Sequence, residues 1–305
     1  MTINPSTLIN ADLPLPLSFR GKVRDTYQLG NLLLIIATDR ISAFDSVLPC
    51  GIPDKGKVLN QLSAFWFEKT KDLVTNHLIE VVNDVHCLDA YLPAESRFPY
   101  PSYLAGRSMI VKKAKRIPIE CIVRGYLSGS AWAEYQHQST VSGSSLPKGL
   151  QESQELPQPL FTPTTKEDTG HDQPMNMIDV RKMMGEALAE EIKEKSLAIY
   201  NHAREHARAR GIIIADTKME FGLDNDELIL IDELLTPDSS RFWDASQYEV
   251  GKSQPSYDKQ PVRDWLLESG WNKEPPAPML LPEVIEATTK RYQQAYEVLS
   301  GRKLK

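Results

Sequence analysis

The segment Ile212–Gly222 places three ionisable side chains directly after an aliphatic run. Alternate residues of a strand share a face, so Asp216, Lys218 and Glu220 would lie together on one side of the strand. Ionisable groups at the end of an apolar strand are costly unless they serve a site that binds charged ligands. The alternative is a strand that reaches the surface with a solvated salt bridge, which is the commoner origin of a single triplet of this kind.

The apolar run Leu228–Ile231 favours the binding site, because it ends directly in a second acidic residue, Asp232. A magnesium ion bound to nucleotide phosphates takes one or two protein carboxylates, and Glu220 and Asp232 are candidates. A hairpin with the four-residue turn 223–226 would instead place Asp232 on the side of Thr217, away from Glu220. We therefore predict an odd-length loop or a bulge in this hairpin.

A second group of candidate residues lies on the predicted strand Ile119–Gly125, where Glu120 and Arg124 share a face by the same alternation. The chain then passes into a predicted helix, Ser130–Gln138. Exposed N–H groups at a helix N-terminus bind anions, and Arg124 could add a bidentate contact to a phosphate or carboxylate. An N-capping serine beside a structural arginine explains the same residues equally well.

The third group is the segment Gly21–Tyr27, in which a glycine is followed by the cations Lys22 and Arg24. Two cations on one strand face could cover nucleotide phosphates. The spacing matches neither the phosphate-binding loop of NTPases nor the glycine pattern of dinucleotide-binding proteins. Taken alone, a solvated basic edge strand is the simpler interpretation.

The remaining pattern predicts the elements that position these residues. Strands and helices mix without a strict alternation, which favours an α+β fold over a doubly wound sheet. A long segment, 142–177, is rich in proline, serine and threonine and shows no periodicity, so we expect a functional or disordered loop there. The expected elements are a hairpin over 22–38, helices over 57–74, 261–268 and 282–299, a strand over 108–114, a helical stretch over 178–210 with a break near Gly185, and a second hairpin over 211–233.

Composition excludes several classes of protein. The 305 residues include 35 basic and 41 acidic side chains, a formal charge of −6 that disfavours a general nucleic-acid partner. No apolar run approaches the ~20 residues that span a bilayer, and the N-terminus does not resemble a signal peptide. The 3 cysteines are widely spaced, which fits a reducing compartment. We expect a cytoplasmic protein with no membrane partner.

The motifs together resemble the SAICAR synthetase (phosphoribosylaminoimidazole-succinocarboxamide synthase) family, in its longer, fungal-like form. Two stretches match the family signatures closely: PIECIVRGYLSGS at 118–130 and IADTKMEFG at 214–222. Supporting matches are GKVRDTY, ATDRISAFD, GKVLNQLSAFWF, FTPTTKEDTGHD and LIDELLTPDSSRFW. The resemblance runs from Gly21 to about Trp243.

The resemblance implies an α+β, two-lobed, ATP-grasp-like fold with antiparallel sheets and flanking helices. Residues 1–115 would form the nucleotide-covering lobe, and residues 116–305 the lobe with the metal and substrate sites. The family joins L-aspartate to the carboxylate of carboxyaminoimidazole ribonucleotide (CAIR) in purine biosynthesis. ATP and Mg²⁺ would act through an acyl phosphate, giving SAICAR, ADP and phosphate. A small-molecule kinase or a non-catalytic nucleotide-binding protein on the same fold are the alternatives.

The resemblance also implies roles for individual residues. ATP would be bound by Lys22, Arg24, Lys112, Lys115 and Glu120, and Mg²⁺ by Glu220 and Asp232. The ribonucleotide would be bound by Arg124, Ser130, Arg241, Asp45, Thr165 and Lys166, with Asp216 and Lys218 beside the reacting groups. No motif fixes the aspartate site. A monomer is expected from the resemblance alone.

Overall fold

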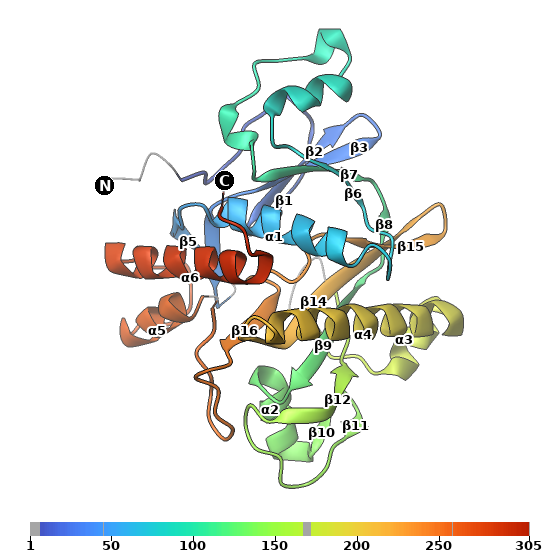
Figure 1. Ribbon diagram of the computed structural model, residues 1–305, viewed down its shortest axis with the longest axis vertical. Coiled ribbons are helices and arrows are strands. Elements are labelled where there is room, and N and C mark those ends of the chain that lie inside the picture. Colours follow the sequence, from blue (N-terminus) through green and yellow to red (C-terminus); the bar gives the residue numbers. More distant parts are fainter. Residues whose placement is uncertain (1–6, 45, 167–171, 258, 305) are drawn as a thin grey trace.

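The computed structural model describes residues 7–44, 46–166, 172–257 and 259–304. Two antiparallel sheets, each flanked by helices, make up most of the described chain, which confirms the expected α+β class. In Figure 1 the first sheet lies above most of the second sheet. Among the described residues, no helix is both long enough and apolar enough to cross a membrane.

The first sheet has the strand order β1-β2-β3-β7-β6. Its strands are β1 (Leu17–Arg20), β2 (Arg24–Leu29), β3 (Leu32–Ala37), β7 (Ser108–Lys112) and β6 (Leu78–Val81). The predicted first hairpin is present as β2 and β3, which pair up to Leu29 and Leu32 around a turn containing Gly30 at φ 63°. One face packs on a segment with three short 3-10 helices: η1 (Val85–Ala90), η2 (Ala94–Ser96) and η3 (Ser102–Leu104).

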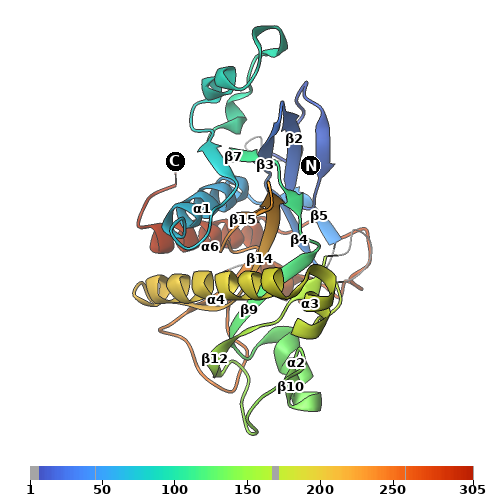
Figure 2. The ribbon, with the colours of Figure 1, turned by 90° about the vertical axis from the view of Figure 1, so that its right-hand side faces the viewer.

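The second sheet is organised around one long strand, β14 (Ile212–Asp224). It pairs with four others: β9 (Ile119–Tyr126), β15 (Glu227–Ile231), β16 (Ser240–Asp244) and β8 (Lys115–Arg116). Strands β12 (Glu155–Phe161) and β13 (Thr164–Thr165) pair with β9. The β14–β15 hairpin rises from this sheet toward the first one (Figures 1 and 2). One strand therefore carries side chains from the middle of the second sheet to the space between the sheets.

Helices cover the apolar faces. The predicted helical stretch is split at Gly185, φ 87°, into α3 (Met177–Met184) and α4 (Glu186–Arg208). Helix α4 contacts β9 and β14, and the hydroxyl of Tyr200 donates a hydrogen bond to the Ile214 carbonyl, 2.7 Å away. Gly125 permits this contact, because a Cβ there would lie 1.8 Å from the Tyr200 hydroxyl oxygen.

The other helices join the two halves. Helix α1 (Lys55–Lys69) packs against α6 (Pro282–Ser300), and one hydrophobic core runs from α1 and β7 through β9 and β14 to α4 and α6. Helix α5 (Gln260–Glu268) shares a separate core with α6 and the small sheet of β4 (Arg40–Ala43) and β5 (Ser46–Gly51). Helix α2 (Gly129–Gln138) follows β9 directly.

The described part of the segment 142–177 has more regular structure than predicted. It contains β11 (Ser144–Ser145, paired with β10, Thr140–Val141), β12 and β13. Strand β12 was missed because Pro157 and Pro159 cannot donate ladder hydrogen bonds, and its pairing with β9 shifts between Glu155 and Leu160. An edge strand interrupted in this way loses the alternation that marks a strand in sequence.

Candidate active site

The charged face of the second sheet is formed as the alternation predicts. Asp216 is the direct ladder partner of Arg124 on β9, and Thr217, Met219 and Phe221 point to the opposite, buried side. Directly paired residues share a face, so the acidic and basic side chains of both strands project from one side of the sheet. This confirms the predicted common face of β14 and of β9.

Asp216 lies between two arginines from the two strands that flank β14. The Nη1 atom of Arg124 is 3.4 Å from the Asp216 carboxylate. Arg241, the ladder partner of Asp216 on β16, also donates a hydrogen bond to that carboxylate. Gly129, at φ 58°, lets Arg241 approach the start of α2, because a Cβ at residue 129 would lie 2.6 Å from Arg241 Nη2. Burial lowers the pKa of Arg124, and Asp216 partly offsets this shift. Two guanidinium groups therefore pair with one carboxylate beside the start of α2.

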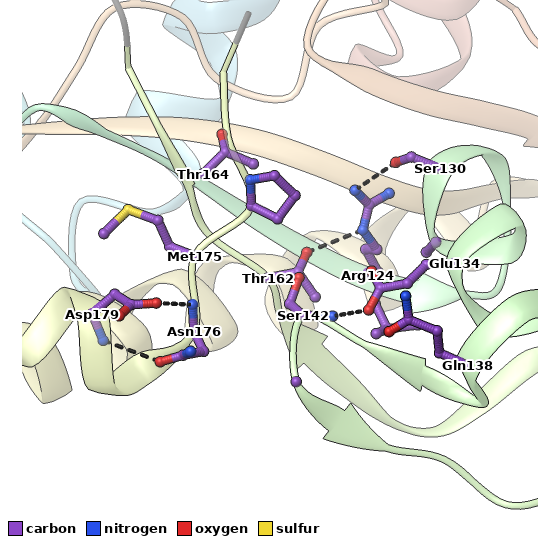
Figure 3. Close-up of a pocket in the computed structure, with 14 residues that line it drawn as sticks. Arg124, Ser130, Glu134, Gln138, Ser142, Thr162, Thr164, Met175, Asn176 and Asp179 are labelled. Atoms are coloured by element: carbon purple, nitrogen blue, oxygen red, sulfur yellow. Dashed lines mark hydrogen bonds between the residues drawn. The ribbon is translucent and has the colours of Figure 1, made fainter.

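Arg124 borders a cavity of about 470 Å³, which is smaller than the cavity between the two sheets described below. Its Nε donates to Thr162 Oγ1 at 3.0 Å and its Nη2 to Ser130 Oγ at 3.3 Å. Figure 3 shows Arg124 held between these two hydroxyls, with the α2 side chains on one side of the cavity and the start of α3 on the other. The remaining polar lining comes from Glu134, Gln138, Ser142, Thr164, Asn176 and Asp179.

A chain of alternating charges continues along the same face. Glu120 accepts hydrogen bonds from Lys218 and Lys166, each at 2.8 Å, and Lys166 also donates to Glu220 at 2.7 Å. Although burial opposes the charged form of Glu120, Lys218 and Lys166 hold the pKa of this carboxyl below its ordinary value. Burial and the nearby charge of Asp232 raise the pKa of Glu220. The buried carboxylates are therefore stabilised by lysines that a ligand could also use.

The larger cavity, of about 1070 Å³, lies between the two sheets. Its apolar wall includes Leu33 and Ile35 of β3, and its polar wall is the charged row of β14 and β9. Lys22, in the turn before β2, and Arg24, at the start of β2, border it as well, and their role in covering phosphates stays a prediction. A cavity with one apolar side and one densely charged side suits a nucleotide, whose base is flat and whose phosphates are anionic.

Arg24 closes the cavity against the end of β15. Its Nη2 is 2.9 Å from Asp232 Oδ2, and its Nη1 is 3.0 Å from Glu233 Oε2. Burial opposes the charged form of Asp232, yet Arg24 lowers the pKa of this carboxyl. The first sheet is thus linked to the second by an ion-pair fork at the proposed metal ligand.

The predicted odd loop or bulge in the β14–β15 hairpin is wrong. The turn is the two residues Asn225 and Asp226, and the ladder runs without a shift from Asp224–Glu227 to Glu220–Ile231. Continued pairing would put Asp232 opposite Met219, on the buried side. The strand ends one residue earlier instead, and Asp232 adopts φ 66°. This left-handed residue redirects the chain, so that Asp232 and Glu220 line the same cavity.

The other predicted residues divide between those that line these two cavities and those, including Asp216 and Arg241, that do not. Lys112 borders the larger one, with its Nζ 3.1 Å from Asp224. Lys115 is exposed on β8 and does not line it, because its neighbour Arg116 takes the inward position of that short strand. Thr165 lines neither cavity for the same reason, since Thr164 faces the smaller one. Asp45 lies outside the described residues.

Several cavity residues were missed by sequence reasoning. His77 is buried at the larger cavity, burial lowers its pKa to about 4, and its Nε2 has no hydrogen-bond partner among the described residues. Asp238 and Lys259 line the same cavity, and Asp238 also pairs at 2.7 Å with the fully buried Lys55 of α1. His77, Lys55 and Lys259 lie outside the quoted motifs, and Asp238 lies within LIDELLTPDSSRFW but was given no role. Lys55 and Asp238 are far apart in the sequence. Sequence order therefore does not show that they form this second buried ion pair.

Comparison with known proteins gives the class of protein. The SAICAR synthetase family model matches residues 17–278. A phosphoribosylaminoimidazole-succinocarboxamide synthase from Thermodesulfovibrio yellowstonii is 54% identical over 285 residues, 92% of this chain and 94% of that protein. A protein of the same name from Pichia angusta is 50% identical over 300 residues, 97% of this chain and 98% of its own length. Both relatives are thus named as synthases of phosphoribosylaminoimidazole-succinocarboxamide.

A solved structure agrees with the sequence match. The SAICAR synthase of Saccharomyces cerevisiae, in complex with SAICAR, superposes with a TM-score of 0.90 at 44% identity and covers 97% of this chain and 99% of its own. A SAICAR synthetase in complex with ADP, at 24% identity and a TM-score of 0.68, shares the fold. The chain belongs to the SAICAR synthetase family, and the resemblance inferred from its motifs is confirmed.

The Glu120 ion pairs predict a pH-dependent contribution to stability. The folded-state pKa of Glu120 lies below its unfolded value, roughly 4.3, so its stabilisation is complete above that value and disappears as the pH falls through the lower folded pKa. Glu120→Gln should therefore lower the melting temperature at neutral pH, and the gap to wild type should narrow in acid. Glu286→Gln, which breaks an exposed pair with Lys290, is the control and should give a smaller gap. A gap that stays constant down to about pH 3 would contradict this account.

Proposed function

We propose that this chain binds ATP in the larger cavity and CAIR in the smaller one, and that it joins L-aspartate to the CAIR carboxylate. The observation that carries the proposal is the continuous charged face of β14 and β9, which borders both cavities. Glu220 and Lys218 face the larger cavity, and Asp216 pairs with Arg124 at the smaller one. Asp216 and Lys218 are about 7 Å apart along the strand, so a phosphoryl group and a carboxylate can meet between them.

We infer that Glu220 and Asp232 hold Mg²⁺ together with the ATP phosphates. The donor set fits this ion, because two carboxylates line one cavity and their charges interact. Among the described residues, no three acidic, histidine or cysteine side chains gather into a complete metal site. Mg²⁺ usually keeps waters and binds through one or two carboxylates plus substrate phosphates, which is the arrangement that two ligands allow.

The chain's own residues would position the reacting groups and neutralise their charge. Arg124, Ser130 and Arg241 would bind the ribonucleotide phosphate or carboxylate, while Lys22, Arg24 and Lys166 would face the ATP phosphates. A CAIR carboxylate oxygen forms a bond to the γ-phosphorus as the bond from that phosphorus to the ADP oxygen breaks. The aspartate amine then attacks the acyl carbon, phosphate leaves and the amine loses a proton. Phosphoryl transfer of this kind relies on positioning and charge stabilisation.

We further propose that the chain divides into two lobes near residue 115. The first sheet uses strands from residues 17 to 112, and the second begins with β8 at Lys115, which supports a boundary between them. Helix α6 packs back onto α1, so the C-terminal helices would couple the lobes. The monomeric state and the cytoplasmic location stay predictions of the sequence.

A coupled assay with ATP, CAIR and L-aspartate tests the ligase directly. ADP and SAICAR should form in equal amounts, and sustained ADP release should need all three substrates. ADP release without aspartate would favour a kinase, and nucleotide binding without any turnover would favour a binding protein.

The metal assignment predicts a severe effect of Glu220→Gln. The loss of a ligand carboxylate should lower kcat/KM by at least about a hundredfold, since even outer partners of metal ligands contribute 10–100-fold. Glu227→Gln on the same hairpin is the matched control, because Glu227 is exposed and contacts Thr75 instead of the cavity. If the Glu220 variant is about as active as the control, Glu220 is not a metal ligand.

The placement of CAIR predicts a selective effect of Ser130→Ala. Loss of a hydrogen bond to a charged group should raise the KM for CAIR by roughly tenfold, with the KM for ATP unchanged. Ser145→Ala on the exposed strand β11 is the control. Steady-state kinetics with each substrate varied in turn would measure both constants, and an equal rise for ATP would show that the two cavities do not divide the ligands as proposed.

A further inference from the structure

Arg24 pairs with one carboxylate of the proposed metal site, Asp232, and with its neighbour Glu233. Its guanidinium forks onto Asp232 at 2.9 Å and Glu233 at 3.0 Å, and its side chain is only 18% exposed. Lys166, in the same way, lies 2.7 Å from the second proposed ligand, Glu220. Both carboxylates that would bind a cation therefore already have a cation as partner.

The backbone around Arg24 is held in place, so its side chain can exchange partners without a movement of the loop. The Gly21 amide donates to the Arg24 carbonyl at 2.8 Å, and the Thr38 amide donates to the Val23 carbonyl at 2.9 Å. The same turn borders the cavity in which the phosphates would lie. A guanidinium leaving Asp232 would thus meet the phosphates by rotation about its own side-chain bonds.

The acidic side of the fork also keeps its shape without Arg24. Glu233 accepts a hydrogen bond from Thr236 Oγ1 at 2.7 Å, and Asp232 is directed by its own left-handed backbone. The carboxylates would therefore stay in position when the arginine leaves. The exchange needs no rearrangement of the hairpin.

We propose that Arg24 is a positioning residue that makes metal binding depend on nucleotide binding, because it pairs with Asp232 and Glu233 until phosphates draw it away. This inference rests on the proposed metal site at Glu220 and Asp232. A free divalent cation must displace this guanidinium from Asp232 and Glu233, so it binds weakly. When nucleotide and metal arrive together, the phosphates take the arginine and the metal takes the carboxylate. Such coupling is reciprocal, so the metal strengthens nucleotide binding by the same factor.

The proposal predicts opposite effects of Arg24→Met on two affinities. Free Mn²⁺, measured by electron paramagnetic resonance without nucleotide, should bind roughly tenfold more tightly than in wild type, within the usual range of coupling. ADP, measured by calorimetry at saturating Mn²⁺, should bind more weakly. A residue that merely supported the fold would weaken both when removed.

Three variants sharpen the test. Arg24→Lys keeps the charge but cannot pair with two carboxylates at once. Its affinity for free Mn²⁺ should therefore fall between the affinities of wild type and Arg24→Met. Lys259→Met removes a cation that lines the same cavity but pairs with Asp238, at 3.5 Å, and should change free Mn²⁺ binding by less than about twofold. The double variant Arg24→Met with Asp232→Asn should lose the gain, because the released carboxylate is absent.

The outcomes separate this inference from the metal assignment on which it rests. Free Mn²⁺ affinity that is unchanged or lower in both Arg24 variants, with circular dichroism and melting temperature like wild type, would overturn the role of Arg24. Should Arg24→Met lose its fold, Arg24→Lys alone decides the point. Mn²⁺ binding in the presence of ADP that is unaffected by Asp232→Asn would instead overturn the metal site itself.

Discussion

The pairing of buried carboxylates with lysines and arginines across β14 is the interaction on which the rest of this site depends. Asp216 and Glu220 are both buried on one strand, four residues apart, and Glu120 is buried beside them on β9. Two unit charges 4 Å apart interact by ~4 kcal/mol at an effective dielectric constant of 20, so unpaired carboxylates here would destabilise the fold. Arg124, Arg241, Lys166 and Lys218 supply the partners. The same cations are the groups that phosphates and carboxylates of substrates would need.

This double use explains how a chain with a net charge of −6 can bind anionic ligands. The cations are gathered on one face of one sheet and at the turn before β2, and the acidic residues that partner them are mostly buried. Net charge governs long-range attraction, whereas a cavity responds to the charges that line it. In the structure those lining charges are paired with one another. Ligands would then bind by exchanging partners, and the fold would not have to hold isolated buried charges beforehand.

The local order of the site could be read from sequence, but its long-range pairing could not. Alternation on β14 correctly placed Asp216, Lys218 and Glu220 on one face, and the same rule correctly paired Glu120 with Arg124 on β9. The rule failed at Asp232, because one residue at φ 66° after the strand reverses the expected side, and its backbone angle is not encoded in a glycine or a turn motif. It also gave no hint of Lys55 with Asp238, since 183 residues separate the partners of this buried pair. The periodicity of the sequence predicts which face of a strand a residue occupies. The partners of that residue are determined by tertiary packing.

The break in strand geometry at Asp232 has a functional consequence of its own. A carboxylate that stayed in the ladder would lie on the side covered by α4, where Met219 and Phe221 are buried. A longer turn or a bulge would have moved it to the correct side, but it would also have shifted the pairing of Phe221 and Leu230, both of which are fully buried in the main core. Ending the strand at Ile231 keeps that core in register and changes the direction of a single side chain. The hairpin strands therefore keep the register of the core up to Ile231, and Asp232 turns toward the cavity only where that packing ends.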